Sequence, residues 1–232
     1  ETSVKYLTLQ KDDSRFQNDI GDSIVINREG SEEGLLGIQV YDDDITGDPV
    51  LEDGINVSFW VSTDGGTTYG PNLDNETNST GYAVYYFGPT CSYQAGPQTW
   101  FAGTGPNTCY TTINQTDPTI GQSQGLTITG QLKNNLQIPN WSSGSQPAFN
   151  VTDQIVIRFN ISSDCSAEGI LAGASSITIN LTNEDTGNYS LCSSWEDEGD
   201  GWYNCTWDSS GQPEGNWSIN ITTNMNNYNP NT

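Results

Sequence analysis

Apolar and polar residues alternate through much of this chain. In residues 216–222, Trp217, Ile219 and Ile221 take every second position, and Asn, Ser or Thr stands between and beside them. Successive side chains of a β-strand point to opposite faces. The segment is therefore predicted to be a strand with one buried face and one polar face.

Similar short segments recur between turns that contain Gly, Asp, Asn and Pro. Many short strands with turns between them are typical of antiparallel β-sandwiches. The predicted fold class is therefore all-β, with two tandem antiparallel sandwich domains. We expect the strands at residues 3–9, 23–27, 35–41, 55–62, 80–87, 96–102, 109–114, 126–132, 155–161, 176–181, 189–195, 202–207 and 217–223.

Composition divides the chain into parts. Residues 115–125 are rich in Gln, Gly, Ser and Thr and mark the predicted boundary, which places the two sandwiches at residues 22–120 and 121–232. Residues 1–21 have no cleanly apolar face and are expected to be a strand or a linker. Their alternative role is an extended arm that adds a strand to the sheet edge of a neighbouring molecule. The Asn-rich residues 224–232 are expected to be a linker.

Length and charge limit the classes of function. A chain of 232 residues can bury two modest cores, and no apolar run approaches the length of about 18 residues that a transmembrane helix needs. We expect no direct membrane span in this segment. The 29 acidic and 6 basic residues give a net charge of -23. Nucleic acid and anionic membrane are therefore not expected as partners, because their phosphates would be repelled.

The sequence contains twelve Asn-x-Ser/Thr triplets, against about five expected by chance at this composition. In several of them an apolar residue separates the Asn from the hydroxyl residue, which on a strand puts both on the polar face. We predict that most of these sites carry covalently attached N-glycans. The acceptors are Asn56, Asn75, Asn78, Asn114, Asn140, Asn150, Asn160, Asn180, Asn188, Asn204, Asn216 and Asn220.

Five cysteines beside so many sugar acceptors indicate an oxidising, extracytoplasmic setting. Cys192 and Cys205 flank an acidic turn and are predicted to form a disulfide across a hairpin, in a register that places Trp195 opposite Trp202. This register leaves an apolar side chain on the sugar-bearing face. A bulge, or pairing with Cys165 instead, would resolve that conflict.

Cys91 and Cys109 enclose the strand around Trp100 and are predicted to form the second disulfide. Cys165 is then the odd cysteine, either a free or buried thiol or the site of an intermolecular disulfide. We do not expect it to be a nucleophile, because the chain contains no His to activate it.

Candidate catalytic and metal chemistry is sparse. The absence of His removes Ser-His-Asp triads and His-based zinc sites. The many Asp and Glu residues could supply the pair of carboxylates that a glycosidase needs. These acids lie in predicted loops and turns, however, so no enzymatic activity is expected.

Two acidic loops offer the oxygen ligands that Ca²⁺ prefers. The first carries Asp42, Asp44 and Asp48; the second, residues 196–201, begins like an EF-hand loop but has Trp207 in place of the closing Glu. Calcium is the only cofactor that the sequence suggests.

Four segments in sequence order resemble a known family. They are residues 47–50 (GDPV), 54–59 (GINVSF), 80–83 (TGYA) and 96–102 (GPQTWFA). They are similar to the bacterial immunoglobulin-like modules of invasin and intimin type, which also occur in archaeal surface proteins. The resemblance covers residues 22–115 and only the closing strands of the second half. It implies immunoglobulin-like sandwiches that act as spacers, adhesin segments or assembly units, without catalytic residues.

These observations predict a structural, heavily N-glycosylated extracellular protein. It would be a subunit or repeat segment of a cell-surface filament, sheath or surface layer, self-associating by strand addition. The resemblance also implies an archaeal source. The alternative is an adhesin or receptor ectodomain that binds a protein or glycan partner, with Trp141, Trp195 and Trp202 as a sugar-stacking surface. The chain opens at Glu1 without a leader, so we expect a removed signal peptide or a piece of a longer protein.

Overall fold

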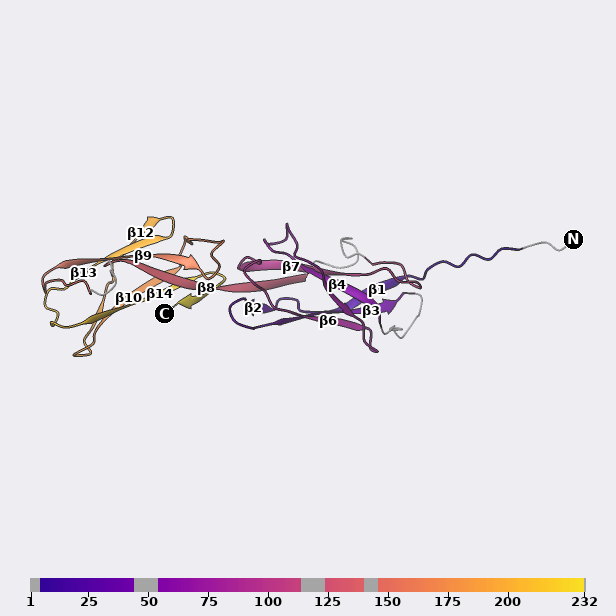
Figure 1. The fold of residues 1–232 in the computed structure, drawn as a ribbon, viewed down its shortest axis with the longest axis horizontal. Helices are drawn as coiled ribbons and strands as arrows, with labels where there is room; N and C mark the ends of the chain where they lie inside the picture. Colours follow the sequence, from indigo (N-terminus) through magenta and orange to yellow (C-terminus); the bar gives the residue numbers. More distant parts are fainter. Residues whose placement is uncertain (1–4, 44–53, 114–123, 140–145, 232) are drawn as a thin grey trace. The chain divides into compact units, whose positions relative to one another are not determined.

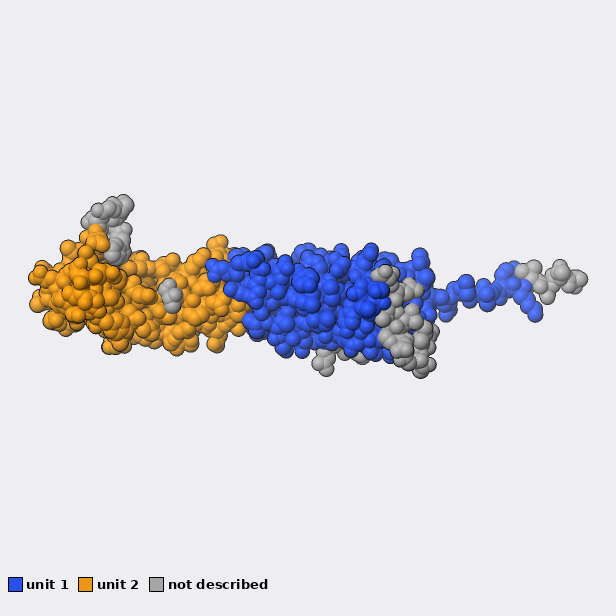
Figure 2. Space-filling view, turned by 90° about the horizontal axis from the view of Figure 1, so that it is seen from below, with its two compact units in different colours: residues 1–128 blue, residues 129–232 orange. Residues whose placement is uncertain are grey.

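The computed structural model describes residues 5–43, 54–113, 124–139 and 146–231. These residues form strands, turns and loops without any helix, which confirms the all-β prediction. The chain divides into two compact units, residues 1–128 and 129–232 (Figure 2). The predicted boundary between residues 120 and 121 lies outside the described residues, and the division between the units falls within strand β8 (Gln124–Ile138).

Unit 1 contains two sheets (Figure 1), with strand orders β1-β3-β6 and β5-β4-β7-β8; β2 also pairs with β8. Phe59 and Trp100 from one sheet and Leu36 and Ile38 from the other belong to one buried cluster, which forms the core of this unit. The strands before β8 are β1 (Ser14–Ile20), β2 (Val25–Asn27), β3 (Gly34–Asp42), β4 (Asn56–Val61), β5 (Leu73–Glu76), β6 (Tyr82–Phe87) and β7 (Gly96–Thr104).

Unit 2 also contains two sheets, with orders β11-β10-β14-β15 and β12-β13-β9-β8. β15 runs parallel to β8 and pairs Tyr228 with Gly130, which joins the two sheets along one edge. The core contains Phe159 and Tyr203 from one sheet and Ile179 from the other. The strands after β8 are β9 (Gln154–Ser163), β10 (Ser176–Asn183), β11 (Tyr189–Leu191), β12 (Trp195–Gly199), β13 (Trp202–Asp208), β14 (Trp217–Met225) and β15 (Tyr228–Asn231).

β10 shows how the sequence determines the two faces of a strand. Ile177, Ile179 and Leu181 are buried, whereas Thr178 between the first two is exposed and Asn180 between the last two is half-buried. The two-residue period therefore gives each sheet a core face and a polar face.

The structure corrects the expectations for both ends of the chain. Residues 5–9 of the strand predicted at residues 3–9 belong to no strand, and the first strand is β1. Only Phe16 of β1 is buried. The predicted C-terminal linker instead contains β15. Backbone hydrogen bonds to a neighbouring strand hold both β1 and β15 in place. Both strands carry few apolar residues, so their sequences show only a weak hydrophobic pattern.

Two expectations inside unit 1 are also wrong. The strand predicted at residues 109–114 is absent from its described part, where Tyr110 makes only an isolated bridge to Asp12. β5 lies between the strands predicted at residues 55–62 and 80–87, where no strand was predicted. Its sequence, Leu-Asp-Asn-Glu, has no apolar alternation to identify it.

Candidate functional site

The predicted glycan acceptors that the structure describes lie on accessible positions. Ten of the twelve fall within the described residues, and none of these ten is buried. Asn114 and Asn140 lie outside the described residues. Seven are exposed: Asn56, Asn75, Asn78, Asn150, Asn188, Asn216 and Asn220. Three are half-buried: Asn160, Asn180 and Asn204. Oligosaccharide attached at these ten positions would meet solvent, and glycosylation of the sites stays a prediction.

Two acceptors face each other on one sheet of unit 2. Asn180 on β10 pairs directly with Asn220 on β14, and Thr182 pairs with Ser218. The middle residues of these triplets, Leu181 and Ile221, are buried. The polar face of this sheet therefore displays side-chain amides and hydroxyls in register.

The acceptor at Asn150 departs from the expected strand geometry. It lies in a turn before β9, and its backbone N–H donates to Asp153 Oδ2 at 2.7 Å. Val151, the middle residue of the triplet, is 38% exposed. Here an exposed turn, and not the alternation of a strand, makes the Asn accessible.

Unit 2 also contains a pocket of about 390 Å³ that the sequence did not reveal. Phe149 and two indoles, Trp207 and Trp217, supply its aromatic lining; Asn150 and Asn216 line it as well. A signal was present in the sequence, because Phe149 precedes one acceptor and Trp217 follows the other. Spacing alone could not bring these separate segments together.

The structure contains the predicted disulfide between Cys192 and Cys205. Cys192 follows β11, and its N–H donates to Ile179 O of β10, whereas Cys205 lies in β13 of the opposite sheet. The bond therefore joins the two sheets through the core of unit 2 and does not bridge one hairpin.

The hairpin register predicted around this disulfide is wrong. Trp195 pairs with Cys205, and Trp202 pairs with Gly199 after a register shift between Asp197 and Gly199. A bulge of the kind considered from the sequence is thus present. Cys192 itself lies before the hairpin strands β12 and β13, and its backbone is bonded to β10 of the other sheet.

The second predicted disulfide, Cys91 with Cys109, is contradicted. Cys109 is a free, exposed thiol, whereas Cys91 is disulfide-bonded. The nine residues of β7 lie between them, and nine extended residues span about 30 Å. A disulfide requires Cα atoms about 4.4–6.8 Å apart, so cysteines that flank a full-length strand are poorly placed to pair.

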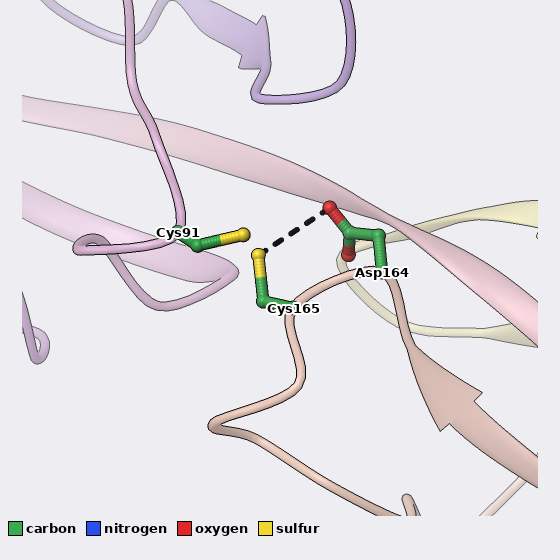
Figure 3. A group of neighbouring side chains, drawn as sticks. All are labelled: Cys91, Asp164 and Cys165. Carbon is green, nitrogen blue, oxygen red and sulfur yellow. Dashed lines mark hydrogen bonds between the residues drawn. The ribbon is translucent and has the colours of Figure 1, made fainter.

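The odd cysteine is consequently Cys109, and the expectation of a free thiol at Cys165 is wrong. Cys165 is fully buried and disulfide-bonded. Its Sγ lies 3.5 Å from Asp164 Oδ2, the approach marked in Figure 3. A disulfide sulfur carries no proton to donate, so this approach is a packing contact. Cys91 and Cys165 have no thiolate to offer a metal ion.

The first calcium candidate is only partly described. Asp42 is buried, and its Oδ2 accepts a hydrogen bond from Tyr110 Oη at 3.2 Å. Asp44 and Asp48 lie outside the described residues. Calcium binding in this loop therefore stays a prediction.

The second acidic loop has a structural role that the sequence did not indicate. Glu198 forms an ion pair with Arg158 on β9, at 2.7 Å between Nη2 and Oε2. The Arg158 guanidinium, and after it the Asn204 amide, lowers the pKa of the Glu198 carboxyl. The same guanidinium lies over the Trp202 ring, 4.2 Å from its centroid. The carboxylate thus reaches past β13 to Arg158 on β9 and is poorly available to a cation.

Of the tryptophans expected to form a sugar-stacking surface, the two that the structure describes, Trp195 and Trp202, do not share a face. Trp195 packs against the core, with its ring 5.9 Å from that of Tyr203. Trp202 alternates with buried Tyr203 and therefore points outward beneath Arg158. Trp141 lies outside the described residues.

The disulfides indicate an extracytoplasmic protein, as expected from the cysteine content. Within the described part of the chain, no helix has the length and apolar character needed to cross a membrane.

Comparisons with known proteins find structural similarity only. No protein-family model matches the chain, and no curated protein matches it significantly. The chain is similar to a tetra-tandem repeat in the extending region of a large adhesion protein, with 13% identity and a TM-score of 0.35 over 94% of this chain and 46% of that one. It is also similar to a 1.5-MDa bacterial ice-binding adhesin, with 10% identity and a TM-score of 0.38 over 96% and 62%.

A third similar structure is a Ca²⁺-stabilized adhesin of an Antarctic bacterium, with 10% identity and a TM-score of 0.29 over 94% of this chain and 49% of that one. The chain spans less than two thirds of the length of each of these three proteins. The resemblance to immunoglobulin-like surface modules stays a prediction, and these weak similarities carry no argument about function.

Proposed function

We propose that the chain is a structural, N-glycosylated extracellular protein, a subunit or repeat segment of a filament, sheath or surface layer. Its subunits associate when the N-terminal arm of one molecule, residues 5–11, adds to a sheet edge of another. Sandwiches give such a material stiffness, and disulfides limit unfolding. Glycans and excess carboxylates hydrate its surface.

The exposed apolar side chains of the arm carry this proposal. Tyr6, Leu7 and Leu9 are 92%, 86% and 87% exposed. Residues 5–9 belong to no strand and extend away from the sheets of unit 1 (Figure 1). Burying such side chains against a partner gains about 25 cal/mol per Å², and an extended segment can pair its backbone with a sheet edge.

Charge also favours the arm as the associating segment. Lys5 and Lys11 are two of only six basic residues in a chain with 29 acidic ones. Residues 5–11 contain no acidic residue, so this locally basic segment is attracted to another copy, whose net charge is strongly negative; Lys11 Nζ also donates to Asn107 O of its own unit. The accessible acceptor positions described above support the glycosylated surface.

Imaging of assembled material tests the proposal. We expect deletion of residues 1–12, or the pair of substitutions Leu7→Ser and Leu9→Ser, to abolish assembly observed by electron microscopy while each unit stays folded. Val25→Ser is the matched control. Val25 is also an exposed apolar residue, with an exposed fraction of 59%, but it lies in β2, outside the arm. This control should assemble like the unmodified protein.

Normal assembly of the truncated protein would overturn association by the arm. Native material composed of isolated monomers would instead favour the alternative, an adhesin or receptor ectodomain. Intact-mass analysis of the natural protein tests the glycans separately, because a mass equal to that of the bare polypeptide would exclude them.

A further inference from the structure

The pocket in unit 2 combines an apolar lining with two glycan acceptors. Asn150 and Asn216 both line it, and so do Val151 and Trp217, the middle residues of their triplets. Both Asn side chains belong to exposed residues. Sugar attached at either position would therefore begin beside the pocket.

The aromatic residues of this pocket present carbon surfaces. The rings of Trp207 and Trp217 lie 5.0 Å apart. Trp207 Nε1 donates to Ser190 Oγ at 2.9 Å, and Trp217 Nε1 donates to Pro213 O at 3.2 Å. Because both indole N–H groups are bound within the protein, the indoles offer the pocket their apolar faces and edges.

Part of this apolar surface remains in contact with water. Phe149 is 49% exposed and Val151 is 38% exposed. An apolar patch beside a large pocket is a marker of binding. In a chain with only 33% hydrophobic residues, these exposed apolar side chains make the pocket a candidate binding surface.

We propose that the N-glycans on Asn216 and Asn150 fold back over this pocket, with a pyranose ring packed on the indole of Trp217. The pocket is thus an intramolecular carbohydrate-binding site that the protein's own glycans occupy. This inference rests on the glycosylation included in the proposed function. It adds that the glycans on Asn216 and Asn150 are held by the protein, and that the pocket around Trp217 holds them.

Two physical arguments favour this occupant. One face of a pyranose ring consists of C–H groups, which pack on the electron-rich face of an indole while the hydroxyls stay in water. The covalent linkage also raises the effective concentration of the sugar at the pocket to about the millimolar range. At this effective concentration even a weakly stacking sugar occupies the pocket for part of the time, so no separate ligand is needed.

Substitutions that remove a triplet without altering the pocket test the proposal. Ser218→Ala abolishes the acceptor triplet of Asn216, and Thr152→Ala abolishes that of Asn150; both leave the Asn, Val151 and Trp217 in place. Thr222→Ala is the matched control, since it removes the triplet of Asn220, which does not line the pocket. All variants are made as the full chain in the native glycosylating host.

Hydroxyl-radical footprinting with mass spectrometry then measures oxidation of individual tryptophans. We expect oxidation of Trp217 to rise severalfold in the double variant and to stay unchanged in Thr222→Ala. Trp202, half-buried on the outer face of β13, serves as an internal reference that should not change. Circular dichroism verifies that every variant is folded.

Three results would overturn the inference. If glycopeptide analysis of the unmodified protein finds no sugar on Asn150 or Asn216, both the inference and glycosylation at these sites fail. If the sugars are present but Trp217 oxidises equally with and without them, the inference alone fails. If Trp217 stays protected in the double variant and becomes oxidised on dilution, a second copy of the chain occupies the pocket instead.

Discussion

Asn180 on β10 lies directly opposite Asn220 on β14, in the register of an antiparallel pair. Cβ atoms in such pairs are about 4.5–5.5 Å apart, so glycans on both residues would crowd each other. Asn180 is the less exposed of the two, and its Oδ1 accepts a hydrogen bond from Tyr189 Oη at 2.8 Å. We therefore expect modification of Asn220 to hinder modification of Asn180.

Thr222→Ala tests this crowding, because it removes the triplet of Asn220 and should raise the modified fraction of Asn180. Quantitative glycopeptide mass spectrometry measures both fractions. Thr206→Ala, which removes the triplet of Asn204 on the other sheet, is the control and should leave Asn180 unaffected. An unchanged fraction at Asn180 in Thr222→Ala would show that the two sites are modified independently.

Loss of the inter-sheet disulfide should destabilise unit 2. Cys192 and Cys205 are 13 residues apart in sequence, and closing a loop of this size contributes about 3 kcal/mol in the chain-entropy model. Replacing both by Ala should lower the free energy of unfolding by roughly 2–4 kcal/mol, measured by urea denaturation. Cys109→Ser is the control, because that thiol is exposed and free. Equal loss in both proteins would contradict the prediction.

Glu198→Gln tests the ion pair with Arg158. Because the partner lowers the pKa of Glu198 in the folded state, the pair stabilises the fold above the ordinary Glu pKa of about 4.3, and this stabilisation disappears as the pH falls through the lowered pKa. We expect the variant to be slightly less stable at pH 7, since Arg158 and Glu198 are 29% and 28% exposed. This difference should vanish in acid.

Urea unfolding at neutral pH and again in acid measures this change. Glu196→Gln removes a negative charge from the same strand and serves as the matched control. If the stability difference between E198Q and the unmodified protein persisted in acid, the carboxylate would not be its source.

Truncation of Phe159 should leave a cavity in unit 2. The side chain is fully buried and stacks on Tyr203 at 5.8 Å between ring centroids. Phe159→Ala is expected to reduce the free energy of unfolding by about 3–5 kcal/mol. Val156→Ala on the same strand should cost about 0.5 kcal/mol or less, since Val156 is 41% exposed. Thermal and urea denaturation distinguish these outcomes.

The central strands were predictable because their side-chain pattern reflects burial. Ile177, Ile179 and Leu181 alternate with polar residues, and β10 lies where that alternation places it. β1 and β15 were missed for the opposite reason. Their backbone groups are paired with neighbours, yet few of their side chains enter a core, so alternation is nearly absent.

The candidate sites divide in the same way. Local sequence indicated the polar positions of Asn180 and Asn220, because each acceptor lies two residues from its hydroxyl on the same face of a strand. The cysteine pairing depends on which sheet each residue joins. Proximity in sequence identified Cys205 as the partner of Cys192. The same reasoning wrongly paired Cys109 with Cys91, because Cys109 is a free thiol. The pocket around Trp207 required segments distant in sequence to meet.

Because Cys192 and Cys205 lie on either side of the β12–β13 turn and are bonded to each other, a break in the backbone at this turn does not release a fragment. A protease that cuts the exposed β12–β13 turn would leave both pieces linked by sulfur. The nicked protein would migrate as one band on a gel until a reductant is added. Outside a cell, where hydrolases act on every accessible turn, that turn can be lost without shedding the strands on either side of it.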